Sequence, residues 1–197
     1  MRKEHHIIYV PGLNDQNILN RNLAKLIPFY WHKFSVTTHI IAPHWEEGDS
    51  FGPKLKLLLR EVDALIYHGH IITIVGQSAG GSAAMNAFCE RRNMIHKVVN
   101  ITGRLNRGDN VNPSLEQVSK NSRAFRESVL LFEKVNEPTL KPSDREKCLT
   151  IRPFWDEAVP SSTVSIKGAT NLVAPFPEHT LGGILIGIFY ASKIFNK

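Results

Sequence analysis

The hydrophobic positions along this chain form two alternating patterns, short continuous apolar runs and longer stripes with helical spacing. Short continuous runs are typical of strands that are buried on both faces of a sheet. Such runs predict strands at residues 7–10 and 71–75. Residues 36–41 and 97–102 are also strand-like, and residues 148–151 and 163–166 are the remaining strand candidates.

Apolar residues three and four positions apart indicate helices between these strands. The clearest stripe lies at residues 55–66, opened by a proline and closed by a glycine. Further helices are predicted at residues 18–30, with a kink or early end at Pro28, and at residues 82–92 and 181–195. Residues 115–132 have the pattern of one longer amphipathic helix, in which we interpret Phe125, Val129 and Phe132 as core rather than as a lid.

This alternation of strands and helices predicts an α/β fold in which helices cover both faces of a mainly parallel sheet, with right-handed crossovers. In such folds the functional site lies beyond the carboxyl ends of the strands. With 197 residues and 42% hydrophobic content, we expect one domain over residues 1–197 that buries roughly 70% of its unfolded surface. Candidate chemistry should therefore follow strands rather than precede them.

The charge balance favours a solvated basic surface over a nucleic-acid interface. The net charge is +6 and the pI about 9.4, but basic residues are spread along the chain among acidic ones. Cys89 and Cys148 are not spaced as a metal or redox pair, so we expect free thiols in a reducing compartment. The N-terminus is too poor in apolar residues for a signal peptide, and residues 181–195 are too short to span a bilayer. We therefore expect a cytoplasmic protein without stable membrane insertion.

The motif Gly76-Gln77-Ser78-Ala79-Gly80 lies between a predicted strand and a predicted helix. This is the G-x-S-x-G pattern in the context that gives it chemical meaning, a strand that turns sharply into a helix and presents the serine hydroxyl. Side chains at Gly76 or Gly80 would collide across so tight a turn. The unpaired N–H groups of the following helix point at the same place and favour negative charge. Ser78 is thus a candidate nucleophile.

A serine nucleophile needs a base, and His179 is the best candidate among nine histidines. It follows the last predicted strand and precedes the last helix, whereas the alternative, His44, follows the second strand. His68 and His70 have the spacing of a two-ligand metal pair, but no third ligand is evident and a helix end also favours histidine. We therefore predict no metal.

An acid must orient the imidazole and stabilise its charged form. Asp156 follows the fifth predicted strand and lies between Ser78 and His179 in the chain, in the order Ser, Asp, His. Glu157 beside it and Asp109 after the fourth strand are the alternatives.

With these residues the chain resembles the α/β-hydrolase superfamily, from Ile7 to the C-terminus. The resemblance implies a triad of Ser78, Asp156 and His179, and an oxyanion hole formed by the N–H groups of Ala79 and Leu13. At the Leu13 loop this chain has Pro11-Gly12, where the superfamily often has His-Gly. The first strand matches the third strand of the superfamily, which implies that the two leading antiparallel strands are missing. The resemblance further implies a three-layer α/β/α sandwich of about six mainly parallel strands, without a large cap.

The resemblance implies a small serine hydrolase, lipase-like or esterase-like, that acts on a small-molecule acyl substrate and needs no cofactor. A thioesterase, amidase or acyltransferase would use the same residues, and an inactive binding module on this fold is the alternative from another class. Arg104 is interpreted as a surface arginine, with recognition of a substrate carboxylate or phosphate as its alternative. Aromatic residues at predicted strand ends either line an apolar pocket or pack the loops: Trp45, Phe154, Trp155 and Phe176. Substrate identity and oligomeric state are not predicted.

Overall fold

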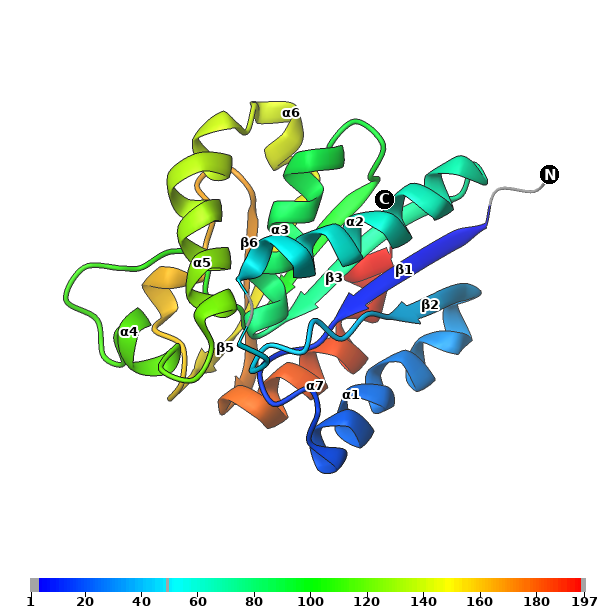
Figure 1. Ribbon diagram of the computed structural model, residues 1–197. Coiled ribbons are helices and arrows are strands. Elements are labelled where there is room, and N and C mark those ends of the chain that lie inside the picture. Colours follow the sequence, from blue (N-terminus) through cyan, green and yellow to red (C-terminus); the bar gives the residue numbers. More distant parts are fainter. Residues whose placement is uncertain (1–3, 49, 196–197) are drawn as a thin grey trace.

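A single parallel sheet forms the centre of the protein (Figure 1). The computed structural model describes residues 4–48 and 50–195. In this part of the chain every strand pairing is parallel and the spatial order of the strands is β2-β1-β3-β4-β5-β6. The strands are β1 His5–Val10, β2 Val36–Ile40, β3 Ile71–Gln77, β4 Lys97–Ile101, β5 Cys148–Trp155 and β6 Thr170–Pro177.

Helices cover both faces of this sheet, as Figure 1 shows. Helices α1 (Ile18–Trp31) and α7 (His179–Phe189) lie on one face, and α2 (Phe51–Tyr67), α3 (Ala79–Arg91) and α5 (Arg123–Leu131) on the other. The predicted three-layer α/β/α fold is confirmed. Shorter elements complete the chain: α4 Leu115–Val118, α6 Pro142–Arg145, α8 Ala191–Phe195, a π-helix at Phe132–Asn136 and 3-10 helices at His32–Phe34, Glu137–Thr139 and Ser161–Thr163.

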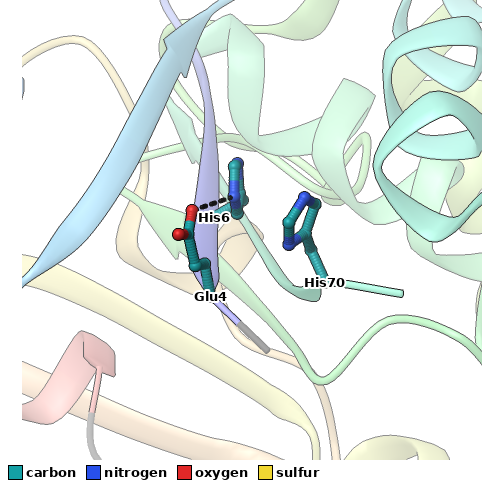
Figure 2. A group of neighbouring side chains, drawn as sticks. All are labelled: Glu4, His6 and His70. Atoms are coloured by element: carbon teal, nitrogen blue, oxygen red, sulfur yellow. Dashed lines mark ion pairs between the residues drawn. The ribbon is translucent and has the colours of Figure 1, made fainter. Parts of the chain in front are cut away.

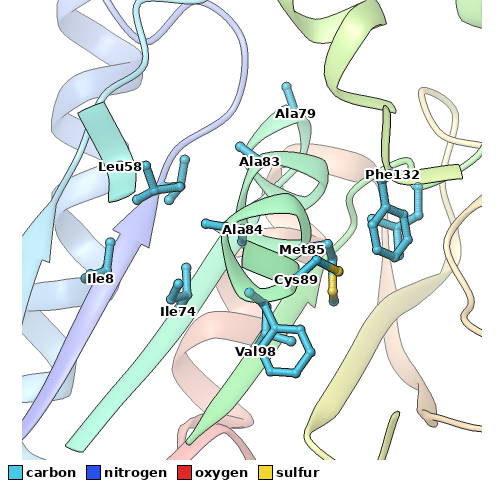
Figure 3. Close-up of a cluster of buried hydrophobic side chains, with 14 of the residues drawn as sticks. Ile8, Leu58, Ile74, Ala79, Ala83, Ala84, Met85, Cys89, Val98 and Phe132 are labelled. Atoms are coloured by element: carbon cyan, nitrogen blue, oxygen red, sulfur yellow. The ribbon is translucent and has the colours of Figure 1, made fainter. Parts of the chain in front are cut away.

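The central strands β1, β3 and β4 are mostly buried and apolar because alternate side chains enter two separate cores. Ile8, Ile74 and Val98 face α3, whereas Ile7 and Tyr9 face α1 and α7. Figure 3 shows the α3 side, where small residues, among them Ala79, Ala83 and Ala84, let the helix approach the sheet closely. Residues 79–89 of α3 are all buried. This burial fixes the start of α3, and with it the turn at Ser78.

The last predicted strand is wrong in position. Residues 163–166 form the end of a 3-10 helix and a turn, in which Val164 and Ile166 are both buried. Their burial explains the apolar pattern without a strand. The true β6 follows at Thr170–Pro177 and contains two prolines. It is an edge strand, a position that tolerates proline because one side of the strand has no ladder that needs its N–H groups.

Residues 115–132 do not form one helix. The segment breaks after Val118 and restarts at Arg123, because Ser122 accepts a hydrogen bond from the N–H of Phe125 (3.1 Å) and caps a new helix. The expectation for its apolar face is confirmed: Phe125, Val129 and Phe132 are at most 4% exposed.

The predicted helix boundaries differ at both ends of the chain. Helix α1 continues past Pro28 to Trp31, so the proline does not end it. The C-terminal helix begins at His179 rather than at Leu181 and is interrupted at Tyr190 before α8. His179 is therefore the first residue of a helix, not a loop residue.

Candidate active site

Ser78 occupies the turn between β3 and α3 in an unusual backbone conformation. Its φ and ψ are 53° and −124°, outside the regions that residues with a Cβ normally adopt. Its N–H donates to the carbonyl of Ile101 (2.9 Å), and its own carbonyl accepts from the N–H of Gly81 (2.9 Å). These bonds hold the strained turn and leave the partly exposed Ser78 side chain at the carboxyl edge of the sheet.

The glycines of the motif are required by space. A Cβ at Gly76 would lie 2.1 Å from the carbonyl oxygen of Gly80, and one at Gly80 would lie 2.0 Å from the carbonyl oxygen of Val10. Both obstacles are backbone atoms, so they cannot move aside as a flexible side chain could. The predicted collision across the turn is confirmed for Gly76, whereas the obstacle at Gly80 is the neighbouring strand β1.

Three polar side chains from distant parts of the chain meet at this edge. His179 Nε2 lies 2.8 Å from Ser78 Oγ, and His179 Nδ1 lies 2.9 Å and 3.1 Å from the two carboxylate oxygens of Asp156. Side-chain exposure is 14% for His179 and 5% for Asp156. Burial of the Asp156–His179 contact limits competition from water.

The contacts determine the tautomer of His179. An ionised carboxylate only accepts hydrogen bonds, so Nδ1 must carry the proton that it donates to Asp156. In the neutral ring Nε2 then has a free lone pair, and this lone pair faces the hydroxyl of Ser78. The arrangement is that of a general base in contact with a nucleophile.

Asp156 and His179 lie at the ends of neighbouring strands. Asp156 follows β5, His179 follows β6, and the N–H of Glu178 donates to the carbonyl of Trp155 (3.0 Å). Asp156 Oδ1 also accepts from the N–H groups of Ala158 and Val159, at 2.9 Å and 2.8 Å. These bonds hold the carboxylate in the orientation in which it contacts the imidazole.

The alternative residues lie elsewhere. Glu157 accepts a hydrogen bond from the backbone N–H of His179 (3.1 Å) and does not take the place of Asp156. Asp109 is exposed on the loop after β4. His44 lies 3.7 Å from Glu47 and is not among the residues around Ser78.

Sequence comparison identifies no relative: no protein-family model matches the chain, and no curated protein does. Solved structures do resemble it. One of them is described under LipS and LipT, two metagenome-derived lipolytic enzymes. It is 10% identical to this chain over 97% of this chain and 94% of that one, with a TM-score of 0.66. Est1E from Butyrivibrio proteoclasticus is 14% identical over 98% of this chain and 90% of that one, with a TM-score of 0.61. A thioesterase domain from the curacin biosynthetic pathway is 10% identical over 98% of this chain and 92% of that one, with a TM-score of 0.60. The chain has the α/β-hydrolase fold.

Within this fold, the loop after β1 lies against Ser78. A Cβ at Gly12 would be 2.8 Å from Ser78 Cβ, and Leu13 follows it in the wall of the pocket. Trp45 Nε1 donates to the carbonyl of Pro11 (3.0 Å) and anchors the loop. Ala79 is the first residue of α3, so its N–H has no partner within the helix. The two N–H groups implied as an oxyanion hole thus belong to segments that border Ser78.

Two buried charged residues that the sequence did not single out hold the neighbouring loop. Lys54 donates to the carbonyls of Pro43 (3.0 Å) and His44 (2.6 Å), and the carboxylate of Asp15 accepts from the N–H of His44 (2.6 Å). Lys54 directly precedes the apolar stripe at residues 55–66, and no sequence signal separates it from a surface lysine, although it is only 7% exposed.

A pocket of about 620 Å³ opens beside Ser78 and His179. Its apolar wall comes from both halves of the chain: Leu13, Ile40, Val118, Phe125, Val159 and Ile184. The four aromatic residues considered from the sequence do not line it. Trp45 is buried and anchors the Pro11 loop, Phe176 packs against Phe189 and Tyr190, and Phe154 and Trp155 are more than half exposed.

The expectation that Arg104 is a surface residue is wrong. Its side chain is fully buried next to the pocket and donates to the carbonyls of Asn106 (3.1 Å), Pro113 (2.9 Å) and Arg107 (2.5 Å). Burial lowers its pKa, opposed by the carboxylates of Glu116 and Glu133. Arg104 thus organises the loop after β4 from inside.

Both cysteines are free, as expected, and both are buried. In the described residues, no helix has the length and apolar character that crossing a bilayer requires.

Proposed function

We propose that this protein is a serine hydrolase that cleaves carboxylic esters or related acyl compounds, with Ser78, His179 and Asp156 as its catalytic residues. The observation that carries the proposal is the 2.8 Å contact between Ser78 Oγ and the lone-pair nitrogen of His179, inside a pocket large enough for a small acyl substrate. Neighbours of the same fold include lipolytic enzymes, an esterase and a thioesterase domain.

In the first half of the reaction, His179 Nε2 takes the proton of Ser78 as Oγ attacks the substrate carbonyl. The carbonyl oxygen becomes an oxyanion, which the N–H groups of Ala79 and Leu13 stabilise. Asp156 stabilises the imidazolium, which then gives its proton to the leaving alkoxide as the carbon–oxygen bond breaks. An alcohol leaves, and an acyl group stays on Ser78.

In the second half, His179 removes a proton from water, which attacks the acyl-enzyme. Collapse of the second tetrahedral intermediate returns the proton to Ser78 and releases the carboxylic acid. These steps use only groups of this chain, a substrate and water. Ser78 is partly exposed, so water can reach the acyl-enzyme.

Reaction of the purified protein with a fluorophosphonate probe tests the proposal, because such probes phosphonylate only an activated serine. We expect one adduct, located on Ser78 by mass spectrometry and absent from Ser78→Ala. If the folded protein forms no adduct, the proposal of a serine hydrolase is contradicted and the binding-module alternative is favoured. Hydrolysis rates measured on a panel of short and long aryl esters, thioesters and amides would then show which of these bonds the protein cleaves.

A further inference from the structure

Two histidines lie at the amino ends of neighbouring strands, at the edge of the sheet opposite to Ser78. His6 is the second residue of β1 and His70 immediately precedes β3, while His39, further along β2, contacts His6 from the other side. Figure 2 shows His6 between the carboxylate of Glu4 and the ring of His70. One ligand atom from each of Glu4, His6 and His70 lies within 4.8 Å of the other two. This distance suits a shared cation.

One ring nitrogen of each histidine is buried without a hydrogen-bond partner in the described part of the chain. These atoms are His6 Nε2 and His70 Nδ1. The His6 side chain is only 9% exposed, and its ring lies against that of His70 with centroids 4.0 Å apart. A buried polar atom without a partner is costly. The cluster therefore lacks a group that these nitrogens could bind.

A hydrogen-bonded chain on the other side of His6 orients its ring. The carboxylate of Glu61 lies 3.0 Å from His39 Nδ1, so Nδ1 must be the donor. With neutral rings, His39 Nε2 is then the acceptor and His6 Nδ1 donates to it over 2.9 Å. This leaves the lone pair of His6 on Nε2, which faces Glu4 Oε2 at 3.5 Å. A metal-ligating histidine usually donates its other ring N–H to a hydrogen-bond acceptor that fixes the ring. Here His39 is that acceptor for His6, and Glu61 in turn orients His39.

We propose that Glu4, His6 and His70 bind a divalent transition-metal ion, with Zn²⁺ as the best match. Two imidazole nitrogens and one carboxylate oxygen form a common zinc donor set, and water would complete a tetrahedral site. Zinc–ligand bonds of about 2.0–2.2 Å place ligand atoms roughly 3.3–3.6 Å apart. The separation between Glu4 Oε2 and His6 Nε2 is already 3.5 Å, so closing the set needs a movement of about an ångström that brings the His70 nitrogen and the 62% exposed side chain of Glu4 together.

The ion would join two neighbouring strands. Residues of β1 and β3 pair in parallel register, with His6 beside Ile72, and the N–H of Ile71 donates to the carbonyl of Glu4 (2.9 Å). The proposed site is at the amino edge of the sheet and the triad is at the carboxyl edge. We therefore expect the ion to stabilise the fold without taking part in ester cleavage, and the inference does not depend on the proposed function.

Calorimetric titration of tag-free, chelator-treated protein with Zn²⁺ tests the site, and Mg²⁺ serves as the comparison ion because it prefers oxygen ligands. We expect one Zn²⁺ per chain with a Kd of about 10 μM or tighter, and no comparable heat with Mg²⁺. At a Zn²⁺ concentration near 100 times Kd, Tm should rise by about 5–10 °C. Absence of saturable Zn²⁺ binding by the folded protein would overturn the proposal.

Variants locate the ligands. Glu4→Gln and His70→Gln should weaken Zn²⁺ binding at least tenfold, and His6→Gln should abolish it. His68→Gln is the matched control, since His68 is exposed, two residues from His70, and outside the ligand set. Circular dichroism without metal verifies folding, and Glu4→Gln decides the assignment if His6→Gln does not fold. Unchanged binding in Glu4→Gln and His70→Gln, or loss in His68→Gln alone, would refute the assignment.

Discussion

Gly12 and Ser78 approach each other so closely that a Cβ atom on Gly12 would lie 2.8 Å from Ser78 Cβ and 3.2 Å from Ser78 Oγ. The loop after β1 therefore has no room for a side chain at this position. Leu13 follows Gly12 and lines the same pocket as Ser78. If Leu13 donates to the oxyanion, its position depends on the glycine before it.

Gly12→Ala should reduce kcat for ester hydrolysis by about 10- to 100-fold, because the methyl group displaces the loop and its N–H donor. Steady-state kinetics and a thermal melt would measure the effect. Gly52→Ala is the matched control, since a Cβ there meets nothing within 4 Å. Unchanged kcat in a folded Gly12→Ala protein would remove this loop from the oxyanion hole.

Asp156→Asn should slow turnover by up to about 10⁴-fold while the fold persists, because the amide no longer selects the tautomer with the lone pair on His179 Nε2. The comparison variant is Glu157→Gln, which alters a carboxylate that accepts from the backbone N–H of His179 and not from its ring. We expect the second variant to retain most activity. If the two variants lose activity equally, Asp156 is not the specific partner of the imidazole.

Glu178 caps the helix that carries His179, since its carboxylate accepts from the N–H groups of Thr180 (3.0 Å) and Leu181 (2.6 Å). Burial acts to raise the pKa of Glu178, but these N–H groups, Glu157 and His179 outweigh it and lower the pKa below its ordinary value of 4.5. A lowered acid pKa means that the ionised cap stabilises the fold above about pH 4.5. This contribution disappears as pH falls through the folded-state pKa.

Glu178→Gln should therefore be less stable than the wild type by about 0.5–1 kcal/mol near pH 7. Near pH 3 the two proteins should approach equal stability. Denaturant titrations at both pH values would measure this convergence. A constant difference across the range would mean that ionisation of the cap is irrelevant.

Burial raises the pKa of Cys89 and of Cys148 to about 12, from an ordinary value of 9.0. Because only the thiolate reacts with a disulfide reagent, both thiols should react slowly with it near pH 8 in the native protein. Two equivalents should react quickly in denaturant. The raised pKa values also imply that their contribution to stability is complete below pH 9 and declines as pH rises toward 12. Rapid native labelling would show that one of the thiols is accessible.

The sequence predicted local features well where one physical cause dominates. The turn at Ser78 was predictable because a strand, two glycines and a helix occupy consecutive positions, and the structure places Ser78 at a φ of 53°. The buried strands were predictable because both of their faces are apolar. The β6 strand was missed because edge strands tolerate prolines, and the buried turn at residues 163–166 has an equally apolar pattern.

What only the tertiary structure decided is which distant side chains meet. Asp156 and Glu157 both follow β5. The carboxylate of Asp156 contacts the imidazole of His179, whereas the carboxylate of Glu157 accepts from the backbone N–H of the same residue. His68 and His70 had the spacing of a metal pair, yet His70 lies beside His6 because parallel pairing aligns the amino ends of β1 and β3. By itself, the sequence determined the fold class and the candidate nucleophile, since both follow from local periodicity and sterics. Contacts between residues far apart in the chain depend on strand order and register, which no local pattern contains.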